Sequence, residues 1–390
     1  MLLWKFAIIT FSLFVQDSKP ASNPTTNNIK KNTQVDSLIA KGVEILLATE
    51  DGGTWTYEGV YRESGEIPIG YRVGGTAIVC NALLHAAKSD DKKAAAAIDR
   101  GVDFILQNLG DEKLAPSTID RYDVRIWGQS CSLELFCHLK MKNRLGPKAK
   151  EIEEWMPKLV ATITTEEIEE GGWNYASRKA SAPFVTAPVA HTLLFARAAG
   201  LSVSDEMLTR ARDFLKRCRL DSGAFVYDER SLKSNIARDQ VDKRDRTAKV
   251  PGAVGRSPVS EATLMLLGDG NADHIKKSID AFFEHWGELE KRRAKTGTHI
   301  GTYGIAPYYF YYAHRYTAMA IELLPKEKRD AERKRLLEYI LKTKDEDGSW
   351  NDRHFPRSKA YGTAMVILAL LRENGPMPQR LPDVKNVKRK

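Results

Sequence analysis

The sequence predicts an all-α fold in which six helical hairpins close into a ring, an (α/α)6 toroid. Three observations support this prediction. A turn that combines glycine with an aromatic residue recurs along the chain, as in DEDGSW at 345–350. A charged amphipathic helix precedes such turns and a more apolar helix follows them. A helix without a polar face must be surrounded by other helices, and neither terminal hairpin carries the polar face that caps an open array.

The expected helices alternate between two kinds. Charged outer helices are expected at 35–48, 92–108, 148–165, 204–217, 271–293 and 327–343. Apolar inner helices are expected at 72–87, 125–139, 184–200, 257–270, 311–324 and 358–371. Because the sixth inner helix is as apolar as the first, we predict that the last hairpin packs against the first and closes the ring.

The aromatic residue of the turn has a predicted structural role. Related turns are TEDGGTWTYEG at 49–59, EEGGWNYASR at 169–178 and DSGAFVYDER at 221–230, with a weaker version, KTGTHIGTYGI, at 295–305. A large aromatic ring buries much area with few rotatable bonds, and glycine permits a tight backbone. We therefore expect successive hairpins to be wedged together by Trp55, Trp173, Phe225 and Trp350.

Composition limits the possible partners. The 390 residues carry a net charge of +9, which fits either a solvated basic surface or an acidic ligand such as a phosphate or polyuronate. The basic residues are interspersed with acidic ones and no nucleic-acid-binding motif occurs, so nucleic acid is not an expected partner. The four cysteines are widely spread without a CxxC pair, and we expect buried hydrophobes rather than a predicted disulfide framework.

The ends of the chain differ from its middle. A short basic start, MLLWK, precedes about ten apolar residues, FAIITFSLFV, which is typical of a Sec-type export signal and too short to span a membrane. We predict a signal peptide at 1–22, a disordered leader at 23–34, the toroid at 35–375 and a basic tail at 376–390, in an exported protein that is not integral to a membrane. The charged stretch 228–256 interrupts the repeat, as a lid over one mouth of the ring or as a solvated disordered loop.

The stretch RLLEYILKTKDEDGSW resembles the repeat of the prenyltransferase and squalene-cyclase superfamily, the terpenoid cyclase and protein prenyltransferase toroids. The resemblance extends over the chain after residue 34 and is specific from Asp347 to Trp350. The glutamine usual in that repeat is absent, and Lys342 or Lys344 stands there instead. The resemblance implies an α/α toroid and does not by itself imply a reaction.

The chemistries of that superfamily require residues that this chain only partly supplies. Cyclases use a protonated carboxyl in an Asp-x-Asp-Asp segment, which is absent, so that Glu261 is the nearest candidate acid. Prenyltransferases hold zinc with Asp, Cys and His, and here only Asp123, Cys131 and His314 offer such a set, without the usual spacing. No metal or other cofactor is otherwise predicted, and the thioester motif of the complement-like branch is absent.

A carbohydrate-active toroid is a further hypothesis. The segment APYYFYYAHRYTAM at 306–319 gathers tyrosines with a histidine and an arginine at the entrance of an inner helix. Lyases need a cation that neutralises the substrate and a residue that moves a proton, which makes Tyr309, His314 and Arg315 candidate catalytic residues. The alternative is an aromatic plug that packs the ring.

Other candidates come from the first turns of the inner helices. Ligand-binding candidates are Tyr71, Arg72, Arg125, Trp127, His191, Tyr308, Tyr312 and Tyr361. Asn81, Glu134 and His191 fall at a similar depth and would ring a cavity with polar groups if they point inward; otherwise they are satisfied core residues. Three hypotheses follow: a protein that binds an apolar or isoprenoid-type ligand in a central cavity, a polysaccharide lyase or hydrolase, and a non-catalytic interaction scaffold.

Overall fold

The computed structural model describes residues 25–233, 237–293, 295, 297–306, 309–353 and 355–383. The chain divides into a unit that ends at Ser37 and a unit that begins at Leu38. Within the described part, the first unit consists of the beginning of helix α1 (Thr25–Ala48). Residues 25–34 are therefore helical, which corrects the disordered leader expected at 23–34. The predicted signal peptide at 1–22 lies outside the described residues.

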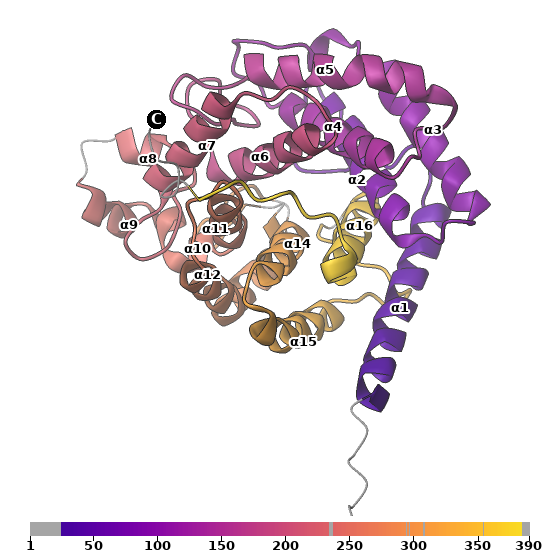
Figure 1. Cartoon of the computed structure of the whole chain (residues 1–390). Helices are drawn as coiled ribbons and strands as arrows, with labels where there is room; N and C mark the ends of the chain where they lie inside the picture. Colours follow the sequence, from indigo (N-terminus) through magenta and orange to yellow (C-terminus); the bar gives the residue numbers. More distant parts are fainter. Residues whose placement is uncertain are drawn as a thin grey trace, which may run out of the picture. The chain divides into compact units, whose positions relative to one another are not determined.

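The second unit contains six helical hairpins (Figure 1). The inner helices are α2 (Ile69–Ala86), α4 (Arg125–Met141), α6 (Pro183–Ala198), α11 (Ser257–Leu266), α14 (Tyr309–Glu322) and α16 (Ser358–Leu371). After α1, the outer helices are α3 (Lys92–Asn108), α5 (Ala149–Thr165), α7 (Asp205–Cys218), α12 (Ala272–Glu284) and α15 (Lys326–Lys342). The inner helices contact one another in this order, and α16 contacts α2, which closes the ring as predicted.

Shorter helices occupy the connections. They are α8 (Arg230–Lys233), α9 (Val241–Arg244), α10 (Val250–Ala253) and α13 (Trp286–Arg292), with 3-10 turns at 112–114, 146–148, 238–240, 246–248 and 372–374. The described residues form no strand beyond isolated bridges within turns. Among these helices, none is both long and apolar enough to cross a membrane.

The aromatic turn is anchored in the same way in three hairpins. The indole Nε1 donates to a carbonyl at the end of the preceding outer helix, from Trp55 to Leu46, from Trp173 to Ile163 and from Trp350 to Ile340, at 2.7, 2.8 and 3.0 Å. The backbone N–H of each tryptophan donates to a threonine hydroxyl on the following inner helix, Thr76, Thr186 and Thr363, at 3.1, 3.0 and 3.1 Å. Each tryptophan is buried and joins the outer helix to the inner helix of its own hairpin. Phe225, the fourth predicted turn aromatic, is buried as well.

The Gly-Thr step shared by the first and last inner helices has a physical reason. A Cβ on Gly75 would lie 2.6 Å from the carbonyl oxygen of Trp55, and a Cβ on Gly362 would lie 2.3 Å from that of Trp350. Glycine therefore lets the inner helix approach the turn, and the next residue supplies the hydroxyl that accepts the tryptophan N–H.

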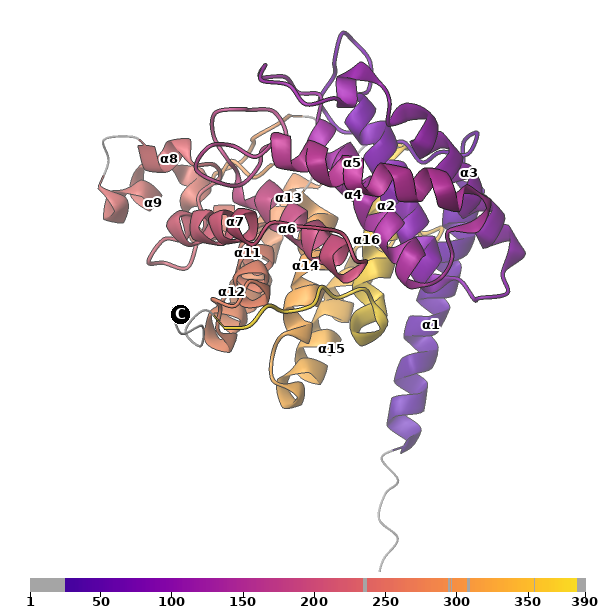
Figure 2. The same cartoon turned by 45° about the horizontal axis from the view of Figure 1, so that its top comes forward.

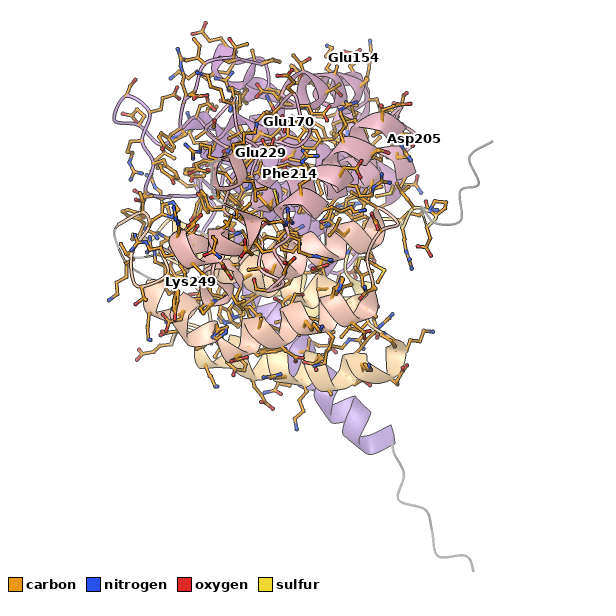
Figure 3. All side chains as sticks on the ribbon, turned by 90° about the vertical axis from the view of Figure 1, so that its left-hand side faces the viewer. Glu154, Glu170, Asp205, Phe214, Glu229 and Lys249 are labelled. Carbon is orange, nitrogen blue, oxygen red and sulfur yellow. The ribbon has the colours of Figure 1, made fainter. Side chains whose placement is uncertain are left out.

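The stretch 228–256 is folded, in the part that the structure describes, into the short helices α8 and α9 (Figure 2) and α10 (Figure 1). Arg256 organises it: its fully buried guanidinium donates to the carbonyl oxygens of Phe225, Val226, Gly252 and Thr247. At its start, Glu229 lies beside Glu170 and 3.2 Å from Lys233 (Figure 3). Between the two interpretations of this stretch, the geometry excludes a solvated disordered loop for the described residues.

The C-terminal stretch also differs from expectation. Residues 375–383 form a strap that runs from α16 to the end of α11, where the N–H of Leu381 donates to the carbonyl oxygen of Leu266 at 2.7 Å (Figure 1). Pro382 lies against Gly268. The first part of the expected basic tail at 376–390 is thus held on the ring, and residues 384–390 lie outside the described part.

Candidate functional site

The six outer-to-inner connections meet at one end of the ring, which we call the turn face. Rings from successive connections touch there: Tyr61 stacks on Tyr122 with centroids 4.7 Å apart, Tyr175 contacts Tyr61, and His299 contacts Tyr227. The hydroxyls of Tyr61, Tyr175 and Tyr227 form a hydrogen-bonded row, at 3.0 and 3.2 Å. Because every inner helix begins at this end, the positive ends of their dipoles favour an anion here.

Beneath this layer lies a cluster of aromatic rings at the top of the ring interior. Tyr57 packs against Tyr71, Trp127 and Tyr361 with centroids 5.0, 5.8 and 4.4 Å apart. The first connection, α2, α4 and α16 each supply one ring. The structure thus brings together three predicted ligand-binding residues, Tyr71, Trp127 and Tyr361, and adds Tyr57.

Asp352 is a buried carboxyl within this cluster. The hydroxyl of Tyr57 donates to its Oδ2 at 3.4 Å, and its Oδ1 has no hydrogen-bond partner among the described residues. Burial raises the pKa of Asp352 to about 7, although the positive charge of Arg353 and the Tyr57 hydrogen bond oppose the rise. A carboxyl with such a pKa can give or take a proton near neutral pH.

Arg353 is the most unusual group of the turn face. Its side chain is 2% exposed, and none of its three guanidinium nitrogens has a hydrogen-bond partner in the described structure. Burial and the charge of Arg353 lower the pKa of nearby Arg292 to about 10, which shows that the two cations repel each other. The guanidinium lies 5.9 Å from the centroid of the Phe355 ring, and its charge acts on Asp352. Burial of a guanidinium without hydrogen bonds still costs several kcal/mol. The buried hydroxyl of Tyr361 also lacks a partner.

Two predicted arginines have other surroundings. Arg125 is buried and donates to Asp123 at 2.9 Å, in an ion cluster completed by Glu166 and Arg178. This cluster joins the second connection to the third, and it pairs the charge of Arg125 with carboxylates of the protein itself. Arg72 lies at the side of the turn face, where it lines a polar cavity of about 410 Å³ together with Glu63, Glu66 and Arg357.

The predicted Tyr-His-Arg cluster does not converge on one site. His314 is fully buried, accepts from Trp286 Nε1 at 2.9 Å and donates through Nδ1 to the carbonyl oxygen of Phe310 at 2.7 Å. The hydroxyl of Tyr312 donates to the Phe184 carbonyl at 2.7 Å. Arg315 points into the ring interior. Consecutive helical residues diverge by about 100°, so proximity in sequence did not bring them together. Tyr308 and the Tyr309 side chain lie outside the described residues.

In the described part of the chain, the ring interior holds a polar network. Arg315 donates to Glu134 Oε1 at 2.7 Å, and Asn81 donates to the same oxygen at 3.0 Å. His191 lies nearby with Nε2 at 2.8 Å from the hydroxyl of Thr263. Asn81, Glu134 and His191 point inward, as one of the two interpretations of the sequence required. Their hydrogen bonds, and that of Arg315, go to one another or to residues of neighbouring helices.

Two further sets of candidate residues have other surroundings in the structure. Glu261 is buried beside Arg219 at 3.5 Å and His274 at 4.0 Å, between α11 and the outer helices, and burial raises its pKa to about 7. It therefore does not face the ring interior. Among the candidate zinc ligands, Asp123 is paired with arginines and His314 is hydrogen-bonded to Trp286. Within the described residues no three His, Cys, Asp or Glu side chains form a group that could hold a metal.

Sequence reasoning missed Asp352, Arg353 and Tyr57, although the repeat contains a pattern that locates them. The position two residues after the turn aromatic is tyrosine in three hairpins, at Tyr57, Tyr175 and Tyr227, and aspartate in the last one, at Asp352. A carboxyl in place of a tyrosine in an otherwise regular repeat marks a position whose role is not packing.

Comparisons with known proteins agree with this architecture. No protein-family model matches the chain, and no curated protein matches it. Among solved structures, the type II terpene cyclase MstE from Scytonema, in complex with geranylgeranyl dihydroxybenzoate, superposes with a TM-score of 0.52 at 13% identity, over 89% of this chain and 99% of that one. The α-1,6-mannanase GH76A of Salegentibacter sp. HEL1_6 gives a TM-score of 0.54 at 13% identity, over 86% and 98%. D-mannose isomerase gives 0.54 at 14%, over 87% and 98%.

These likenesses define the chain as an α/α-toroid protein, as predicted. At 12–14% identity they show the fold alone, and the fold is shared by a terpene cyclase, a glycoside-cleaving enzyme and a sugar isomerase. The reaction must be argued from the site.

Proposed function

We propose that the protein binds an anionic polysaccharide at the turn face and cleaves it as a lyase, by β-elimination at a uronic-acid residue. One observation carries this proposal: three buried polar groups of one cluster, Asp352 Oδ1, the Arg353 guanidinium and the Tyr361 hydroxyl, have no hydrogen-bond partner among the residues that the structure describes. Their charges act on one another, since Asp352 raises the pKa of Tyr361 and Arg353 lowers that of Asp352. A substrate carboxylate would pair with Arg353.

Each group has a role in such a reaction. Arg353 neutralises the substrate carboxylate, which makes the hydrogen on the adjacent carbon more acidic. Asp352 Oδ1 takes that proton, since Oδ2 is occupied by the Tyr57 hydroxyl. The released electron pair forms a carbon–carbon double bond, and the bond to the glycosidic oxygen breaks. Tyr361 donates its proton to that oxygen, and solvent then returns a proton to Tyr361 and removes one from Asp352.

The surroundings of the cluster suit a charged sugar. Tyr122, 53% exposed, stacks on Tyr61 and offers an aromatic face to a sugar ring at the edge of the turn face. The net charge of +9 and the helix N-termini favour a polyanion. Since the three polar groups are buried, substrate entry requires part of the turn face to move. Export, which residues 1–22 predict, would place the protein where extracellular polysaccharides occur.

The test is cleavage of polygalacturonate, alginate and hyaluronan, followed by the ultraviolet absorbance of the unsaturated product. We expect absorbance to grow with one of them, and the rate to fall at least ~100-fold in Asp352→Asn and in Arg353→Met. Arg357→Met removes an exposed arginine from the same connection and is the matched control. Absence of unsaturated product and of binding for all three polymers would reject the lyase and leave the interaction scaffold.

One observation favours a second candidate, acid-initiated cyclisation of an isoprenoid. A carboxyl of raised pKa surrounded by Tyr57, Tyr71, Trp127 and Tyr361 could protonate an alkene, and aromatic faces stabilise cations. The polar network of Arg315, Glu134 and Asn81 in the ring interior favours the lyase, because an isoprenoid chain needs apolar walls.

Arg353→Met separates the two candidates because it acts in opposite directions. Lyase activity would fall, because the substrate carboxylate loses the cation that neutralises it. Cyclase activity would rise, because removal of the positive charge raises the pKa of Asp352 and keeps its carboxyl protonated. Product analysis by mass spectrometry with a geranylgeranyl substrate, for wild type and both variants, gives the comparison.

A further inference from the structure

The opposite end of the ring, where the inner helices end, contains a separate cavity. Its volume is about 280 Å³, and it lies between the C-terminal ends of α2, α4 and α6 and the strap at 375–383. Met141, Phe195, Ala198, Pro376 and Met377 make most of its wall apolar. Two imidazoles, of His85 and His138, and the side chains of Lys142 and Gln379 supply polar groups. The Gln379 amide can donate or accept, so it does not select between head groups.

The two histidines have unused hydrogen-bonding capacity. The Nε2 atoms of His85 and His138 are buried and have no hydrogen-bond partner among the described residues, and His138 as a whole is 1% exposed. Their rings meet edge to face with centroids 4.9 Å apart. Burial lowers the pKa of each imidazole to about 3, so both are neutral at physiological pH. Such a buried polar atom costs free energy unless a ligand satisfies it.

The polar network of the ring interior decides what His138 can bind. Asn81 donates through Nδ2 to Glu134, which also accepts from Arg315. The amide oxygen of Asn81 is therefore the atom that faces His138 Nδ1, at 2.7 Å, and it can only accept. His138 must donate from Nδ1, which leaves Nε2 as an obligatory acceptor. The ligand must therefore present a donor to His138.

Lys142 further restricts which head group the ligand can have. An ammonium head group would donate to Nε2 but would be repelled by Lys142, whereas a carboxylate would pair with Lys142 but has no proton for Nε2. A hydroxyl both donates and accepts. We propose that this cavity is a binding site for a hydroxyl-headed apolar molecule, held by His138 and Lys142 and covered by the strap.

The volume sets the size of the ligand. A cavity of 150 Å³ holds benzene, so this one suits a molecule of roughly ten non-hydrogen atoms, such as a medium-chain alcohol. The site lies at the end of the ring opposite the turn face and does not depend on the function proposed there.

The experiment compares head groups on one tail. Isothermal titration calorimetry on the full chain would use octan-1-ol, octanoate and octylammonium as probes. We expect saturable binding of octan-1-ol with a Kd at least about tenfold lower than for the two charged probes, which corresponds to one hydrogen bond to a buried group. Equal affinity for all three probes, or no saturable binding of the alcohol, would overturn the proposal.

Variants locate the binding. Met377→Trp fills the cavity from the strap without touching the polar network, and His138→Phe removes the acceptor; each should weaken octan-1-ol binding at least about tenfold. His191→Phe is the matched control, since His191 is another buried histidine with an unpartnered ring nitrogen, outside this cavity. Undiminished binding of octan-1-ol to the Met377→Trp variant would refute the assignment of the site to this cavity. If His138→Phe does not fold, Met377→Trp and the comparison of the three head groups still test the proposal.

Discussion

The backbone N–H of Trp350 donates to the hydroxyl of Thr363 at 3.1 Å, and the pairs Trp55–Thr76 and Trp173–Thr186 repeat this contact in two other hairpins. The threonine lies within the first two turns of the inner helix, and the tryptophan lies in the connection that leads to that helix. A hydrogen bond that ties each turn to its helix therefore recurs around the ring, and its strength can be measured.

Replacement of Thr363 by valine should lower the free energy of unfolding by about 1–3 kcal/mol, because the buried N–H of Trp350 loses its acceptor while side-chain volume is kept. Thr317→Val is the control: the hydroxyl of Thr317 is buried without a partner in the described structure, so its loss should be neutral or stabilising. Urea unfolding measures both. Equal losses in the two variants would show that the Trp350–Thr363 bond contributes nothing specific.

Gly362→Ala should destabilise the protein by at least ~2 kcal/mol, since the new methyl group would lie 2.3 Å from the Trp350 carbonyl oxygen and the helix must move away. Gly287→Ala in α13 meets no atom within 4 Å and should be neutral or stabilising by up to ~1 kcal/mol. Thermal unfolding of both variants makes the comparison, and a stable Gly362→Ala protein would contradict the close approach of turn and helix.

The pair of Arg315 and Glu134 crosses the ring interior from α14 to α4. Arg315→Met should cost on the order of 3–5 kcal/mol, because it leaves the Glu134 carboxylate buried without its cation. The double variant Arg315→Met with Glu134→Met should be more stable than the single one, as no uncompensated charge is left. A double variant that loses the sum of both single effects would argue against a direct interaction.

Asp352 should make the stability depend on pH. Its pKa is about 7 in the folded state and 3.8 in the unfolded state, so the folded protein holds a proton that the unfolded chain releases. Its contribution is complete below about pH 4 and is lost as the pH rises to about 7, by up to ~4 kcal/mol. Asp352→Asn should therefore exceed wild type in stability at about pH 8 and match it at about pH 4. Chemical unfolding at both values checks the sign, and parallel curves for the two proteins would show that Asp352 titrates normally.

Two buried arginines should respond to methionine in opposite ways. Arg353 has no hydrogen-bond partner, so Arg353→Met should raise the free energy of unfolding, on the order of 1–4 kcal/mol, in the absence of ligand. Arg256 is equally buried but donates to four carbonyl oxygens, so Arg256→Met should destabilise the protein. If Arg353 serves function, the Arg353→Met variant should gain stability and lose substrate binding. Destabilisation by both substitutions would assign Arg353 a structural role.

The fold was predictable because its determinants are local. The glycine-aromatic turns, the charged helices and the apolar helices recur in order, and apolar helices such as α2 and α16 can bury their surface only in a closed arrangement. The tertiary structure added the reason for the Gly-Thr step and placed residues 25–34 in helix α1. It also shows short helices in the described part of 228–256, where the sequence left a lid and a disordered loop as alternatives.

The candidate site was only partly predictable. Tyr71, Trp127 and Tyr361 came from the first turns of inner helices, which all begin at one face, so their position in the repeat placed them together. His314 and Arg315 are adjacent in sequence and yet bind different partners, because helical neighbours point in different directions. Asp352 and Arg353 lie two and three residues after Trp350, but a sequence does not show whether a charged side chain is paired.

The sequence alone therefore determined the helices, their pairing and the closed ring, since hydrophobic periodicity and turn chemistry act over a few residues. Only the tertiary structure decided which polar groups of the described residues lie without a hydrogen-bond partner, among them Asp352, Arg353 and Tyr361 at the turn face and His85 and His138 at the other end. Whether a buried polar atom has a partner depends on side chains far away in sequence, and such unsatisfied atoms are the ones that a ligand can use.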